Sequence, residues 1–177
     1  MPSTCKERSS LLKSSLTETV IVVRHWAIHT SVLKHMNLAL PGAGEPECFD
    51  FMDWFSENTS EGVALDDGGL ILDEYYALAD DPVVGQDSLY VGLMSDILGT
   101  AGRVTTVSPE VTEEVSGMLS GDEVWCRYVG VAAHSSMVLA HSERSASHML
   151  RRAATQLKVD VHCLPSDNWK AVCGVNP

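Results

Sequence analysis

Residues 62–80, GVALDDGGLILDEYYALAD, predict one strand, one turn and one helix in immediate succession. Val63 to Leu65 form a short apolar run, which indicates a buried strand. Asp66 to Gly69 predict a tight turn, because glycine adopts positive φ angles without steric cost. Leu70 to Ala79 then predict a helix that carries Glu74. A strand that feeds directly into a helix is the building unit of an α/β sheet.

The same alternation extends to both sides of this stretch. Further strands are predicted at residues 20–23, 103–107, 137–142 and 159–164. Further helices are predicted at residues 28–40, 48–60, 86–102, 108–122, 122–135 and 143–157. Helices between short apolar strands predict a three-layer α/β/α sandwich with a mostly parallel central sheet. Residues 1–18 are expected to form a flexible or helical N-terminal arm, residues 19–167 the α/β domain, and residues 168–177 a C-terminal tail.

Composition narrows the classes of function. The 177 residues include 24 acidic and 12 basic side chains, which gives a net charge of -12. This charge argues against binding driven by a nucleic-acid backbone, but not against an enzyme that collects metal ions. No apolar run approaches the length of about 18 residues that crosses a bilayer, so no membrane partner is expected. The five cysteines show no C-x-x-C spacing, which favours a reduced, cytoplasmic protein.

Candidate site residues fall where predicted strands end, because reactive groups collect at the carboxyl edge of a parallel sheet. They are Arg24 and His25 after the first strand, Glu74 after the glycine turn, Asp122 at a helix start, and Ser142 and Glu143 after the fourth strand. Carboxylates from separate segments suit Mg²⁺ or Mn²⁺, which prefer oxygen ligands and activate water. Ordinary solvated helix residues, with Asp122 as a helix cap, are the alternative interpretation.

The order of these elements resembles the PIN domain, the metal-dependent ribonuclease fold of many toxin–antitoxin toxins. The resemblance covers about residues 19–167 and is carried by ALDDGGLILDEYYAL, RVTTVSPEV, DEVWCRYVGVAAHSSMVLAHSERS and VDVHCLPSD. PIN domains carry an aspartate at the end of the first strand, an acid on a central helix, an aspartate that opens a late helix, and another after the next strand. By this resemblance Glu74 is the central acid and Asp122, beside Glu123, the late-helix aspartate. The last acid is replaced by Ser142 or displaced to Glu143.

The resemblance fails at the first strand, where Arg24 stands in place of an aspartate. A guanidinium there is expected to pair with Glu74 or Asp122 and to take the place of the ion, with His25 and Ser142 completing a pseudo-site. One hypothesis is therefore a PIN-like protein with an incomplete acidic cluster and no cofactor, which works through binding or regulation. The alternative is an active Mg²⁺- or Mn²⁺-dependent endoribonuclease. In that case Glu74, Asp122 and Glu143 are catalytic, and Glu74, Asp122 and Glu123 hold the metal.

Two other possibilities follow from the sequence. An unrelated α/β protein could share only the layout, and a transition-metal site could form from His25, His141 and Glu74. As for partners, RNA stays open as a ligand, and a homodimer or another protein partner is expected. The expectation of a homodimer rests on the apolar residues of the segment 51–55, FMDWF.

Overall fold

The computed structural model describes residues 23–37, 44–134, 138–141, 147–164 and 169–174. Its sheet contains the parallel strands β1 (Arg24–Ile28), β2 (Glu61–Asp66), β3 (Val104–Val107), β4 (Val138–His141) and β5 (Asp160–Cys163). Their order across the sheet is β3-β2-β1-β4-β5. The predicted α/β class with a parallel central sheet is confirmed.

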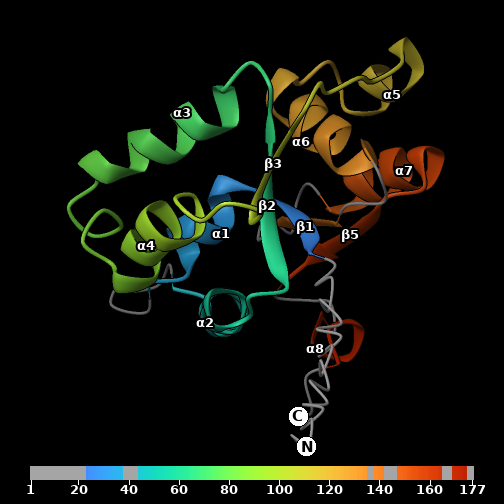
Figure 1. Cartoon of the computed structure of the whole chain (residues 1–177). Helices are drawn as coiled ribbons and strands as arrows, with labels where there is room; N and C mark the ends of the chain where they lie inside the picture. Colours follow the sequence, from blue (N-terminus) through green and yellow to red (C-terminus); the bar gives the residue numbers. More distant parts are fainter. Residues whose placement is uncertain (1–22, 38–43, 135–137, 142–146, 165–168, 175–177) are drawn as a thin grey trace, which may run out of the picture.

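Helices connect each strand to the next. They are α1 (Thr30–His35), α2 (Pro46–Glu57), α3 (Leu70–Ala77) with the 3-10 turn η1 (Leu78–Asp80), α4 (Ser88–Gly92) with the π-helical turn η2 (Leu93–Ile97), α5 (Glu113–Met118), α6 (Glu123–Ala133), α7 (Ser147–Leu157) and α8 (Trp169–Val172). Figure 1 shows α1, α2 and α4 on one side of the sheet and α5, α6 and α7 on the other. The three layers of the predicted sandwich are therefore present.

The strand-turn-helix unit predicted at residues 62–80 is confirmed in detail. Every residue of β2 is buried, and the following turn places Gly69 at a φ of 77°. The Asp66 carboxylate accepts hydrogen bonds from the backbone N–H of Leu70 at 2.9 Å and of Ile71 at 2.7 Å. Because these amides have no partner within the helix, Asp66 fixes both the start of α3 and its direction.

The helix predicted from Ser108 begins later than expected. Thr112 caps α5 through a hydrogen bond from the backbone N–H of Val115 to its hydroxyl, and the preceding residues are not helical. Pro109 packs closely against α6, where a Cβ placed on Gly130 would lie 3.0 Å from the Pro109 Cβ. This tertiary contact accounts for the late start of the helix.

The C-terminal helix α8 covers part of the core. Trp169 is 2% exposed, and its ring lies 5.4 Å from that of Phe51 and 5.5 Å from that of Trp54. Phe51, Met52 and Phe55 are fully buried. The apolar surface on which the expected homodimer rested is therefore used inside the protein, and that argument for self-association is wrong.

None of the helices in the described segments is long and apolar enough to cross a membrane.

Candidate functional site at the carboxyl edge of the sheet

The order of the strands reverses between β1 and β4. The chain moves from β1 to β2 and β3 in one direction, and then returns to place β4 and β5 on the other side of β1. Open α/β sheets bind ligands at the carboxyl ends of the strands that flank such a point. Here β1 ends at Ile28 and β4 at His141, and the backbone N–H of His29 donates to the carbonyl of Ala140 at 2.9 Å. The candidate site is therefore centred on His29 and His141.

His29 caps α1 with its imidazole. Its Nδ1 accepts a hydrogen bond from the backbone N–H of Ser31 at 3.1 Å and lies 2.8 Å from the Ser31 hydroxyl. Because a backbone N–H can only donate, Nδ1 carries the lone pair and the ring proton is on Nε2. Burial lowers the pKa of His29 to about 3, with further lowering from His141 and Lys34. The imidazole is therefore neutral at physiological pH.

Aromatic side chains from α6 enclose His29. The Trp125 ring stacks on the imidazole at a centroid distance of 4.0 Å and an interplanar angle of 14°. The Tyr128 ring meets it edge-on at 4.7 Å, and the buried His141 ring lies 5.7 Å from that of Trp125. Among the described residues, rings rather than carboxylates thus cover the carboxyl ends of β1 and β4.

Glu74 projects from α3 toward α6, and both of its oxygens accept hydrogen bonds. Arg127 Nη1 donates to Oε1 at 2.7 Å, and the Tyr128 hydroxyl donates to Oε2 at 3.1 Å. The side chains are 26% exposed for Glu74 and 15% for Arg127. Burial, followed by the charges of Tyr75 and Glu74, raises the pKa of Tyr128, so its hydroxyl stays protonated and able to donate. The charge of Glu74 is thus balanced by Arg127 of the same chain.

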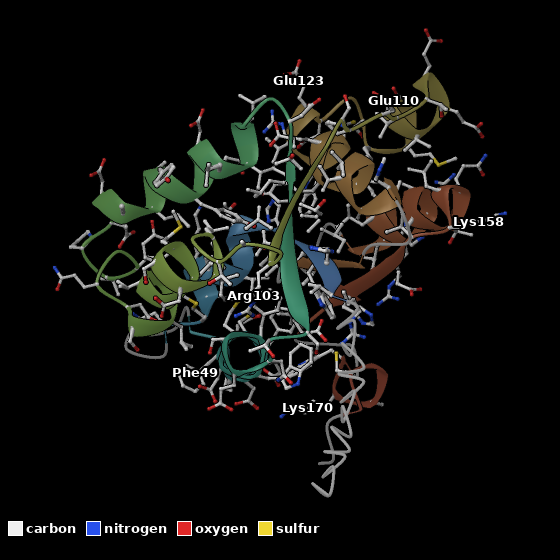
Figure 2. The ribbon with its side chains drawn as sticks, in the orientation of Figure 1. Phe49, Arg103, Glu110, Glu123, Lys158 and Lys170 are labelled. Carbon is white, nitrogen blue, oxygen red and sulfur yellow. The ribbon has the colours of Figure 1, made fainter. Side chains whose placement is uncertain are left out.

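Asp122 caps a helix, as the alternative interpretation of this residue predicted. Its Oδ1 accepts hydrogen bonds from the backbone N–H of Val124 at 3.0 Å and of Trp125 at 3.1 Å, which opens α6. Glu123 follows it at the exposed start of α6, and Figure 2 shows it at the end of the molecule where α3 and α6 begin. Among the described residues, no group of three or more His, Cys, Asp or Glu side chains could hold a metal ion.

Arg24 and His25 lie at the opposite edge of the sheet. Arg24 is the first residue of β1, not the residue after it, and it pairs with Glu61 at the start of β2 through bonds of 2.9 Å from Nε and 2.8 Å from Nη2. The Glu61 carboxylate, 7% exposed, also accepts a bond of 2.6 Å from the indole N–H of Trp26. The expected pairing of Arg24 with Glu74 or Asp122 is therefore wrong.

His25 shares this position at the amino edge. It lies opposite Gly62 near the start of β2, and burial lowers its pKa. A metal site that joins His25 to Glu74 is consequently wrong as well, because the two residues belong to opposite ends of the sheet. Ser142 and Glu143 lie outside the described residues.

Sequence reasoning missed His29, Arg127 and Tyr128. His29 follows the fully buried segment Trp26–Ile28 and precedes the first helix, so it occupies the position that was assigned to Arg24. The short apolar run before His29 indicates a strand, but the longer apolar run at residues 20–23 led to a strand prediction that ends too early in the chain. Arg127 and Tyr128 carry no sequence signal of their own, because only the tertiary fold brings these α6 side chains within hydrogen-bond distance of Glu74.

No family model, curated sequence or solved structure matches the chain.

Proposed function

We propose that this chain is a PIN-like domain that acts through binding or regulation, and that its carboxyl-edge site does not run metal-dependent hydrolysis. The order of elements and the places of Glu74 and Asp122 support the PIN-like part of the proposal. With β1 ending at Ile28, the position of the first-strand aspartate falls to the neutral His29. The departure from the PIN pattern therefore persists at this position, although the residue is not the arginine expected from the sequence.

The observation that carries the proposal is the pair of Glu74 and Arg127. Mg²⁺ and Mn²⁺ need carboxylate oxygens that are free to coordinate. Here one Glu74 oxygen lies 2.7 Å from a guanidinium nitrogen, and the other accepts from a phenol. A cation about 5 Å from Arg127 meets a repulsion of about 3 kcal/mol for each unit of charge at an effective dielectric near 20. A divalent ion is therefore strongly disfavoured beside Glu74.

The net charge of -12 bears on what is bound. Binding to a phosphate backbone gains its strength from clustered lysine and arginine, which release counterions. An acidic chain is better suited to a protein partner than to RNA. We therefore propose that the chain works through contacts with another protein.

Cleavage of nucleic acid tests the proposal. The purified chain is incubated with labelled RNA and single-stranded DNA in Mn²⁺ and in Mg²⁺, beside Glu74→Gln and Asp122→Asn variants. The native chain is expected to cleave no faster than either variant. Cleavage that the native chain shows and both variants lose would establish the active endoribonuclease instead.

A further inference from the structure

An apolar groove lies on the outer surface between α3 and the segment formed by α4 and η2. Its volume is about 300 Å³, and it is lined by Tyr76, Ala79, Tyr90, Val91, Met94 and Ser95. Tyr76 is 58% exposed and Val91 48% exposed. These are two of the most exposed large apolar side chains among the described residues, and they stand in one groove. An exposed apolar patch of this kind marks a contact surface.

The floor of the groove is firmly held. Tyr90 is 3% exposed, and its hydroxyl donates to the carbonyl of Tyr75 in α3 at 2.8 Å. After Gly92 the helix widens into the π-helical turn η2, where the backbone N–H of Leu98 donates to the carbonyl of Leu93 at 3.0 Å. Such turns occur frequently at functional sites. The groove is therefore preformed, which lowers the entropic cost of binding.

The surroundings of the groove are acidic. Residues 35–102 contain more than half of the 24 acidic residues and no lysine or arginine. Asp80 lies near enough to add to the effect of burial, which raises the pKa of Tyr90. Asp73 stands three residues before Tyr76, and so on the same side of α3. Asp96 is exposed beside Ser95, and both Asp73 and Asp80 are exposed as well.

A basic side chain also approaches this region. Lys34 of α1 lies near Asp81 and lowers the pKa of that carboxyl, although the backbone N–H groups of Val83 and Val84 lower it more. Lys34 therefore offsets charge at Asp81, which is not one of the residues that line the groove.

We propose that this groove binds a basic amphipathic segment of a partner protein. Apolar side chains of that segment would contact Tyr76 and Val91, and its lysine or arginine residues would face Asp73 and Asp80. At about 300 Å³ the groove stands at the lower limit for small-molecule sites, and exposed side chains form its walls. It suits the side chains of a docked helix better than an enclosed ligand.

A second copy of the chain fits this groove poorly. A two-fold dimer places the same patch of each subunit against itself. Two acidic surfaces would then face one another, which opposes association. The groove also shares no residue with the carboxyl-edge site, so the inference stands whether or not the chain cleaves RNA.

A peptide titration tests the inference. The probe is a fluorescein-labelled helical peptide of about 18 residues, which is long enough to form a helix. It has leucines at i, i+3, i+4 and i+7 and lysines at the flanks, and a matched peptide carries glutamates in place of the lysines. Anisotropy is measured with the full chain. The lysine peptide is expected to bind at least about tenfold more tightly than the glutamate peptide.

Variants locate the binding. Tyr76→Ser and Val91→Ser are each expected to weaken the lysine peptide by about tenfold, whereas Leu70→Ser, at an exposed residue of α3 outside the groove, leaves it unchanged. Asp80→Asn is expected to weaken it, and Asp53→Asn on the exposed side of α2 serves as the control for charge.

Three results of the peptide titrations would overturn the inference. They are an absence of binding by either peptide, equal affinities for the two peptides, and full binding by the Tyr76→Ser and Val91→Ser variants. A dimer in sedimentation that Val91→Ser converts to a monomer would also overturn it, because a second copy would then cover the groove.

Discussion

The pH dependence of folding stability tests whether His29 is buried and neutral at the carboxyl edge of the sheet. The native imidazole is neutral, with a pKa of about 3, whereas an unfolded histidine titrates near 6.5. As the pH falls below about 6.5, the unfolded chain binds a proton that the folded chain does not accept. His29 therefore destabilises the fold progressively as the pH falls from about 6.5 to about 3.

The size of the effect follows from the shift in pKa. Each pKa unit is worth about 1.4 kcal/mol, so the full effect is about 5 kcal/mol at pH 3. Between pH 7 and pH 5 the free energy of unfolding falls by about 2 kcal/mol, because pH 5 lies only part of the way from the unfolded pKa to the folded pKa. Asparagine at this position can still cap α1, since its side-chain oxygen accepts from a backbone N–H.

The assay is urea unfolding of the native chain and of His29→Asn at pH 7 and pH 5. Between these two pH values the native free energy of unfolding should fall by about 2 kcal/mol more than that of the variant. Contributions from other groups, including the half-buried His25, are present in both proteins and cancel in the difference. Equal pH dependence of the two proteins would show that His29 is not the buried, neutral cap described above.

Two further predictions concern the amino edge and the C-terminal helix. Glu61→Gln should lower the free energy of unfolding by about 2 kcal/mol, because it leaves Arg24 without its buried charged partner. Asp50→Asn, which breaks an exposed pair with Lys170, should cost less than about 0.5 kcal/mol, and equal costs in urea unfolding would contradict the difference in burial. Trp169→Ala should cost about 3 kcal/mol in thermal unfolding because its ring packs on Phe51, and a cost near zero would mean that α8 does not cover the core.

Local signals predicted much of this fold. The turn at Asp66 to Gly69 combines a capping carboxylate with glycine. Its conformation therefore depends only on residues that are close together in the sequence. Asp122 likewise directly precedes an amphipathic segment. Its carboxylate caps the helix by accepting hydrogen bonds from backbone N–H groups of the first helical turn. Signals of this kind need no distant partner, so they can be recognised in the sequence.

The first strand shows what local signals omit. The apolar run at residues 20–23 looks more like a strand than RHWAI does, because the latter begins with a charge. Arg24 enters the sheet since Glu61, on the neighbouring strand, pairs with its guanidinium. That partner is distant in the sequence, and the misplaced strand assigned Arg24 and His25 to the carboxyl edge, whereas they lie at the amino edge.

The candidate site depended on distant contacts in the same way. Glu74 and Asp122 were named from the sequence, but their partners decide what they do. Arg127 pairs with Glu74 only because the tertiary fold brings the two side chains together, and Asp122 is engaged by the amides of its own helix. The identities of the acids were therefore predictable, and their availability for a metal was not.

Calorimetric titration with Mn²⁺ tests most directly whether Arg127 excludes a metal from Glu74. The native chain should bind Mn²⁺ only weakly, and Arg127→Met should bind it at least about tenfold more tightly, because the repulsion beside Glu74 is removed. Arg152→Met, at an exposed arginine of α7, should leave the affinity unchanged. Tight binding by the native chain that Glu74→Gln abolishes and Arg127→Met does not strengthen would contradict the account.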